Sequence, residues 1–346
     1  MSSKKPCFKL IKTQDAVGHI LCHDITQIIP GVVKDARFRK GHVVTAEDIP
    51  VLKSLGKDSL YVWEKADGML HENDAAERLM ALCQNQHMVK TPVKEGKIEL
   101  TADKDGLFTV DIARLNAVNS IGDMIIATRH TNTAVQAGDV LAGGRVIPLV
   151  IAEESIRQAE KAGEGKPLLS LTPWKLKTAA IVTTGNEVFS ELIEDTFTPV
   201  VVEKLERYGI NIIARKLCDD NTERIQAAIL ELREATPDMI LCTGGMSVDP
   251  DDRTPDVICA VCPNIITYGA PVLPGSMFML GYFDDGVPIM GLPGCVMYKK
   301  PTIFDNILPR VMAGVPLTGE DFAAMGAGGL CMNCKECFYP NCAFGK

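Results

Sequence analysis

The sequence predicts an α/β protein whose main domain, residues 176–318, is a doubly wound and mostly parallel sheet. Two observations support this prediction. From Leu176 onward, short apolar runs alternate with amphipathic stretches, and glycine-containing loops follow several of the apolar runs. Alternation at this spacing is typical of parallel strands with helices on both faces. Ligands of such sheets bind beyond the carboxyl ends of the strands, so the loops that follow the strands form the candidate site.

The elements of this domain can be predicted in chain order. Asp220 and Glu223 fit a capping box at the start of one helix, and Pro255 suits the first turn of another. We expect strands at residues 178–184, 210–217, 238–243 and 287–293, and helices at residues 199–208, 220–235, 254–261 and up to about residue 311.

The preceding chain has a different texture. Residues 1–95 predict an N-terminal α+β segment, with a helix at residues 46–55 that Thr45 caps and Gly56 ends. A strand at residues 59–62 and a helix around residues 72–83 follow. Residues 96–175 predict a β-rich module and a linker helix, and residues 319–346 predict a linker followed by a four-cysteine tail.

Composition limits the class of protein. The 346-residue chain has a formal charge of −8 and no Lys/Arg block, which disfavours nucleic acid as a partner. Its longest apolar runs, such as residues 146–152, are too short to span a membrane. The N-terminus has no apolar h-region, so we expect a cytoplasmic protein in which the cysteines outside the C-terminal tail are free thiols.

Three loops at the expected sheet edge contain glycines, in the strings TTGNEV, CTGGMSVDPDD and GLPGCV. Glycine allows backbone N–H groups to approach an anionic ligand, although neither a P-loop nor the NAD fingerprint is present. The aspartates of the second loop would repel an anion unless a hard cation lay between them. Magnesium binds one or two carboxylates together with phosphate oxygens. The loop therefore predicts a nucleotide–magnesium site with Asp251 and Asp252 as ligands, whereas Asp249, next to Pro250, fits a turn.

Four strings, TTGNEV, CDDNTERI, TGGMSVDPDDRTPD and GLPG, occur in this order over residues 177–315. In order and spacing they resemble the molybdopterin-binding domain shared by molybdopterin adenylyltransferases, molybdopterin molybdotransferases and the competence-damage-inducible protein family. The resemblance implies molybdopterin or its adenylate as ligand. It places Asp220 and Asp252 in the positions of two catalytic acids, and Asp220 also fits the cap of the following helix. It further implies that the ligand is bound by Thr184, Gly185, Glu187, Thr243, Gly244, Gly245, Ser247, Asp256, Pro293 and Gly294.

The resemblance leaves three functions open. The first is an enzyme of molybdenum cofactor biosynthesis, a transferase that acts in nucleotidyl activation or molybdate insertion. Its expected partners are an adenine nucleotide, molybdate, a recipient molybdoenzyme and a second copy of the chain in a homo-oligomer. The second is a carrier that binds the finished cofactor without catalysis, and the third is a nucleotide pyrophosphatase. The DGYA string of molybdotransferases is absent, and ADGML is the nearest match.

The C-terminal string LCMNCKECFYPNCAFGK contains four cysteines with the spacing C-x2-C-x2-C-x4-C. Four thiolates within twelve residues have the spacing of metal ligands, and a tetrahedral thiolate site suits zinc or an iron–sulfur cluster. The last gap is longer than in the bacterial ferredoxin run. The predicted ligands are Cys331, Cys334, Cys337 and Cys342.

Overall fold

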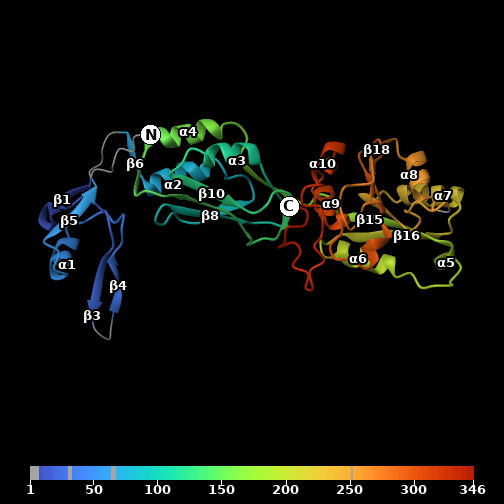
Figure 1. The fold of residues 1–346 in the computed structure, drawn as a ribbon, viewed down its shortest axis with the longest axis horizontal. Coiled ribbons are helices and arrows are strands. Elements are labelled where there is room, and N and C mark those ends of the chain that lie inside the picture. Colours follow the sequence, from blue (N-terminus) through green and yellow to red (C-terminus); the bar gives the residue numbers. More distant parts are fainter. Residues whose placement is uncertain (1–7, 30–32, 64–67, 251) are drawn as a thin grey trace. The chain divides into compact units, whose positions relative to one another are not determined.

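The computed structural model describes residues 8–29, 33–63, 68–250 and 252–346, in which the chain forms two compact units (Figure 1). Unit 1 comprises Met1–Lys104, Thr109–Arg129 and Gln136–Leu171. Unit 2 comprises Asp105–Phe108, His130–Val135 and Thr172–Lys346. Among the described residues, no helix is long and apolar enough to cross a membrane.

The first part of unit 1 is a small sheet that packs on one helix. Strand β5 lies in the centre of the order β1-β5-β2, and both of its pairings are antiparallel. Leu21, Leu52, Leu60 and Val62 are almost fully buried between this sheet and helix α1. Strands β3 and β4 form a separate hairpin. The elements are β1 (Phe8–Lys12), η1 (Thr13–Asp15), β2 (Ile20–Leu21), β3 (Ile25–Ile29), β4 (Val33–Phe38), α1 (Asp48–Ser54) and β5 (Ser59–Trp63).

The second part of unit 1 is a four-stranded antiparallel sheet in the order β10-β12-β8-β7, together with the short pair β13-β6. It contains three helices, of which α3 was not predicted within the β-rich module. The elements are β6 (Met69–His71), α2 (Glu72–Ala81), β7 (Met88–Lys90), β8 (Lys97–Ala102), α3 (Ile112–Asn119), β10 (Met124–Thr128), β12 (Val140–Val146), β13 (Val150–Ala152) and α4 (Glu153–Ala162). The chain then leaves unit 1 within strand β14 (Leu169–Pro173).

Unit 2 is built on a six-stranded sheet in the order β16-β15-β17-β20-β19-β18. The first four strands are parallel, and β19 and β18 are antiparallel to their neighbours. Unit 2 is therefore an α/β domain whose sheet is mixed rather than wholly parallel. Its strands are β15 (Thr178–Thr184), β16 (Asn211–Cys218), β17 (Met239–Thr243), β18 (Asn264–Tyr268), β19 (Met279–Tyr282) and β20 (Pro288–Leu292), and unit 2 also contains β11 (Thr133–Val135) and the first residues of β9 (Gly106–Val110).

Alternate residues of strand β15 face two different cores, because side chains of a strand alternate between the sheet faces. Ala179 and Ile181 belong to the core that contains residues of α6 (Phe197–Glu206) and α9 (Ile303–Met312). Ala180 and Val182 belong to the core that contains residues of α7 (Thr222–Glu234) and α8 (Thr254–Val261). Helices thus cover both faces of the sheet, as the alternating pattern predicted. The remaining elements are α5 (Asn186–Phe189), η2 (Gly294–Met297) and α10 (Gly319–Ala324).

Three local predictions are wrong. Helix α1 begins at Asp48 with Glu47 as its N-cap, so Thr45 does not cap it. Helix α7 is capped by Asn221, whose side chain accepts a hydrogen bond from Arg224 N, so Asp220 and Glu223 form no capping box. The segment expected to be a linker begins with helix α10, because Thr318 and Asp321 form a capping box and Phe322 is buried at 2% exposure.

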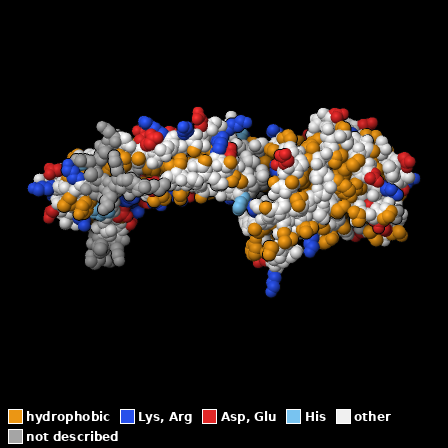
Figure 2. Space-filling view, turned by 45° about the horizontal axis from the view of Figure 1, so that its top comes forward, with side chains coloured by type: hydrophobic (Ala, Val, Ile, Leu, Met, Phe, Trp, Pro, Cys, Tyr) orange, Lys and Arg blue, Asp and Glu red, His pale blue; other side chains and the backbone are white. Residues whose placement is uncertain are grey.

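On the face that Figure 2 shows, acidic and basic side chains are dispersed over both units, whereas hydrophobic side chains gather over unit 2. No single sign of charge dominates this face. The candidate site must therefore be located from the sheet topology and from local contacts rather than from a broad charged surface.

Candidate functional site

The carboxyl ends of four parallel strands meet at one edge of the unit 2 sheet, because β16, β15, β17 and β20 are neighbours that run in the same direction. The loops that follow these strands carry nearly all the residues that the sequence singled out. They bring together Asp220 after β16, Gly185 and Glu187 after β15, and Gly294 after β20. Asp251 lies outside the described residues.

Asp220 is held by the neighbouring loop. Its Oδ2 atom accepts a hydrogen bond of 2.9 Å from Asn186 N, and its own backbone N–H donates to Asn186 Oδ1 at 3.3 Å. Gly185 N also donates to Cys218 O at 3.2 Å. These bonds join the ends of β15 and β16 and direct the Asp220 carboxylate toward the loop after β15. Because Asn221 caps α7, Asp220 is not committed to the helix.

Like charges crowd around Asp220. Its pKa is raised from 3.8, first by burial and then by Glu187, Asp252 and Asp219, while the hydrogen bond from Asn186 acts in the opposite direction. Glu187 comes from the loop after β15 and Asp252 from the loop after β17. Acids on three separate loops therefore act on one another. A bound cation would remove this repulsion.

Hydroxyl groups of Thr184 and Thr254 hold the loop after β17 from its buried side. Thr184 Oγ1 lies 3.1 Å from Thr254 Oγ1, at the start of α8, and donates to Thr243 O at 3.4 Å. A Cβ atom at Gly244 would lie 2.1 Å from Thr184 O, and one at Gly245 would lie 2.8 Å from Thr254 Oγ1. Both glycines also have positive φ, 89° and 55°. They are therefore required by the packing of the loop itself, whether or not a ligand is bound.

Thr184 and Thr243, predicted to bind ligand, are 4% and 0% exposed. Thr243 Oγ1 donates to Thr183 Oγ1 at 3.2 Å, and Thr183 Oγ1 lies 2.7 Å from Thr198 Oγ1 in α6. These side chains form a buried hydroxyl network that joins two strands to α6. The side chains of Thr184 and Thr243 therefore position the loops from within the protein, and their predicted role in ligand binding stays a prediction.

Asp252 folds back onto its own loop. Its Oδ2 atom accepts a hydrogen bond of 2.7 Å from Ser247 N, and its backbone N–H donates to Asp249 O at 2.9 Å. The second bond confirms that Asp249 takes part in a turn. The backbone N–H of Ser247 thus helps to place Asp252, the predicted catalytic acid. Ser247 itself is exposed.

Tyr268, at the end of β18, is near the candidate site but was not among the predicted site residues. Its hydroxyl donates to Met246 O at 3.4 Å. Burial raises the pKa of Tyr268, and the charges of Asp252 and Asp256 raise it further. Tyr268 therefore lies beside the acidic loop. The antiparallel strand that carries it was not predicted, so nothing in the sequence associated it with the site.

Open space lies beside the backbone at two of the loop glycines. A Cβ atom at Gly185 would meet nothing within 4 Å, and one at Gly294 would meet only the Met297 methyl carbon at 4.0 Å. Gly294 is exposed and follows the buried Pro293. At these two positions a ligand could approach the main chain, as the sequence predicted for the whole set of glycines.

The donor atoms at this edge suit magnesium better than a soft metal, because they are carboxylate oxygens. Among the residues that the structure describes, no group of three or more His, Cys, Asp or Glu side chains is placed to hold a metal ion. Of the predicted magnesium ligands, Asp252 lies at this edge and Asp251 lies outside the described residues, so magnesium binding stays a prediction. The same finding applies to the four tail cysteines, which are free thiols that do not converge.

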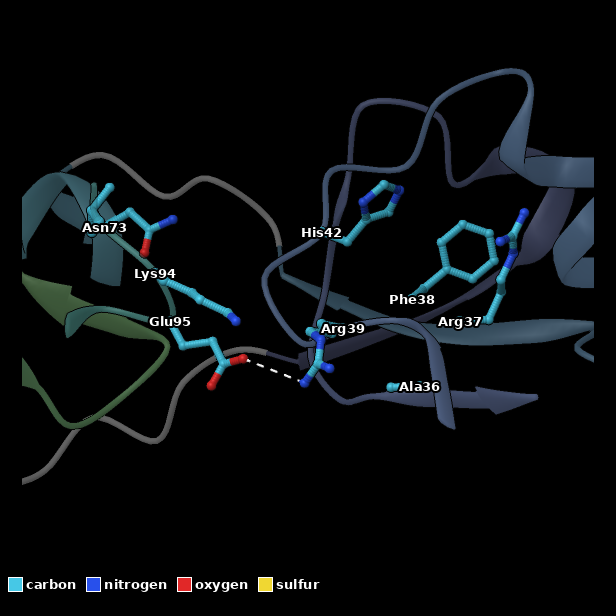
Figure 3. A pocket seen from close by; sticks show the side chains of 9 residues that line it. Ala36, Arg37, Phe38, Arg39, His42, Asn73, Lys94 and Glu95 are labelled. Atoms are coloured by element: carbon cyan, nitrogen blue, oxygen red, sulfur yellow. Dashed lines mark ion pairs between the residues drawn. The ribbon is translucent and has the colours of Figure 1, made fainter. Parts of the chain in front are cut away.

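A separate pocket lies within unit 1, with a volume of about 510 Å³ (Figure 3). Arg39 and Glu95 point toward each other there, with Nη1 and Oε1 3.7 Å apart. His42 Nε2 lies 2.6 Å from Asp48 Oδ2, and Arg39 also approaches Asp35 at 3.8 Å. The pocket is lined by Ala36, Arg37, Phe38, Arg39, His42, Asn73, Val93, Lys94 and Glu95.

The acids and glycines described above lie at the carboxyl edge of a mixed α/β sheet, and this domain matches a known family. Residues 180–313 match the family described as "Probable molybdopterin binding domain", and this part of the chain belongs to that family. The α/β fold and the family predicted from the four sequence strings are thereby confirmed. Residues 10–64 match a domain of unknown function.

Individual relatives match only part of the chain. The "Putative competence-damage inducible protein" of Bacillus mycoides is 34% identical over 95 residues, which are 28% of this chain and 23% of that protein. The "CinA-like protein" of Mycobacterium avium is 29% identical over 94 residues, 27% of this chain and 22% of that protein. The chain thus spans less than a quarter of the length of these curated relatives.

Solved structures are similar over a larger fraction of the chain, about two fifths. The molybdopterin biosynthesis enzyme MoaB of Thermus thermophilus covers 41% of this chain and 99% of its own, with 20% identity and a TM-score of 0.35. The molybdopterin biosynthesis Mog protein of Mycobacterium ulcerans covers 39% and 91%, with 24% identity and a TM-score of 0.33. Similarity at this level does not transfer an activity.

Proposed function

We propose that the protein acts in molybdenum cofactor biosynthesis, as a transferase that binds molybdopterin or adenylated molybdopterin together with magnesium. The observation that carries the proposal is the group of acids from three loops, Glu187, Asp220 and Asp252, within the domain that belongs to the molybdopterin-binding family. The reaction would be nucleotidyl activation of molybdopterin or insertion of molybdate. Molybdate, the adenine nucleotide and a recipient molybdoenzyme are the partners that this reaction requires.

The charge distribution supports a cation-dependent reaction. Burial raises the pKa of Asp220, and repulsion from Glu187 and Asp252 raises it further. The free site is therefore electrostatically unfavourable for an anionic ligand alone. Magnesium supplies, when bound, the positive charge that stabilises phosphate oxygens during nucleotidyl transfer. Asp220 and Asp252 would hold that charge, and the open main chain at Gly185 and Gly294 would receive the phosphate groups.

Two other functions use the same site and are distinguished by their products. A carrier would bind the cofactor without turnover, and a nucleotide pyrophosphatase would hydrolyse a nucleotide ligand at the same edge. The acids of the edge favour turnover, because a passive carrier has no need of carboxylates that destabilise one another. The same carboxylates would serve the transfer of a nucleotidyl group and its hydrolysis equally well.

The test is steady-state release of AMP from molybdopterin adenylate by the full chain, with and without molybdate. Release that depends on molybdate and magnesium supports the transferase. Release at the same rate without molybdate would replace the transferase by a pyrophosphatase. Tight binding without release, together with no release of pyrophosphate from ATP and molybdopterin, would replace it by a carrier.

A further inference from the structure

The C-terminal segment is a closed loop attached to unit 2 at both ends. At its start, Leu330 pairs with Leu273 in a parallel bridge, and Cys331 N donates to Leu273 O at 2.8 Å. At its end, Gly345 N donates to Gly328 O at 3.0 Å, and Phe344 is buried at 4% exposure. Residues 331–346 between these attachments form neither a helix nor a strand.

One side chain in the middle of the loop also anchors it. Tyr339 Oη lies 2.9 Å from Asp305 O and 3.1 Å from Asn306 Oδ1, both on helix α9. The Tyr339 and Phe344 rings contact each other edge to face, with centroids 6.2 Å apart. The second half of the loop is therefore docked on the α9 side of the sheet. It is not a free appendage of the domain.

The rest of the loop buries little. Met332 is 75% exposed and Phe338 is 58% exposed, and residues 332–338 are exposed without interruption. Burial of apolar surface is the usual source of stability for a chain segment, and a short segment without a core requires a cross-link instead. The exposed run contains Cys334 and Cys337.

The four cysteines differ in position in a way that suits such a cross-link. Cys331 and Cys342, near the two attached ends, pack partly buried against the core that α9 helps to form. Cys334 and Cys337 are exposed on the run between them. The four thiols are free and apart in this structure. To bring them together, the exposed run has to fold over the two cysteines that are already held.

We propose that Cys331, Cys334, Cys337 and Cys342 bind one metal centre as four thiolates, separate from the sheet edge of unit 2. Four sulfur ligands close a tetrahedral shell, which suits Zn²⁺ or an iron–sulfur cluster. Each thiol gives its proton to solvent on binding, so occupancy falls as the pH is lowered. The centre fixes residues 332–338 against unit 2.

Metal content of the full chain, purified without oxygen, tests the proposal. The test variant is Cys334→Ser/Cys337→Ser, because both side chains are exposed and their replacement removes no packing. The control is Cys259→Ser, another exposed thiol, on helix α8. Wild type and control should carry about one zinc ion, or one cluster of iron with acid-labile sulfide, per chain. The double variant should carry at least about ten-fold less.

Cleavage by trypsin after Lys335 gives a second measurement that does not depend on any activity. Lys335 is exposed between Cys334 and Cys337, so a bound centre should slow this cleavage at least about ten-fold in wild type and leave the double variant unprotected. The proposal is overturned if wild type holds neither metal after anaerobic addition of Zn²⁺ or of Fe²⁺ with sulfide. It is equally overturned if the double variant keeps its metal, or if Cys259→Ser loses it.

Discussion

Charged side chains meet in opposite ways in the unit 1 pocket and at the edge of the unit 2 sheet. In unit 1, Arg39 faces Glu95 at 3.7 Å, and His42 faces Asp48 at 2.6 Å. At the sheet edge, Asp219 pairs with Arg224 at 2.7 Å, but Asp220 is surrounded by further acids that raise its pKa. In unit 1 each of these pairs joins opposite charges, although Arg37 and Lys94 also line the pocket. At the sheet edge the acids around Asp220 repel it, and either a proton or a bound cation relieves that repulsion.

Pairs of opposite charge and clusters of like charge differ in whether a ligand is needed to explain them. Exposed pairs of opposite charge contribute little to stability and need no ligand to explain them. Burial and neighbouring acids raise the pKa of Asp220 and so disfavour its charged form in the free protein, and groups with such shifts cluster at functional sites. The same reasoning separates the glycines. Gly244 and Gly245 are explained by contacts inside the protein, whereas the main chain at Gly185 and Gly294 borders open space.

The largest effect is expected for Asp252→Asn. Loss of this carboxylate should lower the turnover of molybdopterin adenylate by one or more orders of magnitude, because a metal-linked charge contact is removed. Asp252 is partly exposed, so the melting temperature should change little. Steady-state AMP release and thermal unfolding measure the two quantities.

A matched control removes one acid from a distant turn of the same sheet. Asp284 is exposed in the turn between β19 and β20, which is at the amino end of β20 and so at the opposite edge from the site. Asp284→Asn should keep wild-type turnover. Equal losses in the two variants would mean that net charge, not the acidic edge, determines the rate.

A smaller effect, about ten-fold in affinity, is expected for Gly294→Ala, because the added methyl group occupies the space where the ligand meets the main chain. Gly294 has no positive φ, so the alanine is conformationally permitted. Calorimetry with molybdopterin measures the change. Gly319→Ala is the control, since its Cβ atom would likewise have no close neighbour, the nearest atom being Ile266 O at 3.9 Å. Unchanged affinity in Gly294→Ala would place the ligand elsewhere.

Gly245→Val is a poor test of ligand binding, because its Cβ atom would lie 2.8 Å from Thr254 Oγ1 and its φ is 55°. A loss of binding would therefore report damage to the loop as readily as loss of a ligand contact.

Asp220→Asn should separate stability from activity. The folded-state pKa of Asp220 is raised above 3.8, so the charged form is penalised in the folded protein. The free energy of unfolding of wild type should therefore fall, relative to the variant, as the pH rises from about 4 through the raised pKa. Urea unfolding across this range, without magnesium, should show the variant to be equally or more stable while its turnover is reduced. A variant that is less stable at every pH would contradict the repulsion.

The smallest effect is expected in unit 1. Arg39→Ala removes ion pairs to Asp35 and Glu95 from a side chain that is 51% exposed. It should change the free energy of unfolding by less than about 1 kcal/mol, and it should leave AMP release unchanged. A large loss of turnover would remove the contrast between the two regions, because the pocket would then belong to the site.

Regular patterns in the sequence were sufficient to predict the strands of the parallel sheet. Residues 178–184 form β15 as expected, and β17 and α8 lie within or at their predicted bounds. Strands β18 and β19 were missed, since they are antiparallel to their neighbours and no helix lies between them, so they do not follow the strand–helix alternation on which the prediction rested. The absence of Tyr268 from the predicted site follows directly from that omission.

The sequence does not show which of two neighbouring polar side chains takes a given hydrogen-bonding role. Both Asp220 and Asn221 suit the cap of α7, and only the structure shows that Asn221 takes the role while Asp220 bonds to Asn186 N. In the same way, Thr45 suits the cap of α1, yet α1 begins at Asp48 with Glu47 as its N-cap. Thr184 and Thr243 occupy ligand-binding motifs, but their hydroxyls point into a buried network that no local pattern reveals.

The central claim is that the acids at the sheet edge bind the ligand through magnesium. Anaerobic calorimetry of molybdopterin binding, with and without magnesium, tests it most directly when wild type and Asp252→Asn are compared. Magnesium should tighten binding by wild type at least about ten-fold and should have a much smaller effect on the variant. Equal affinities with and without magnesium in wild type would contradict the account.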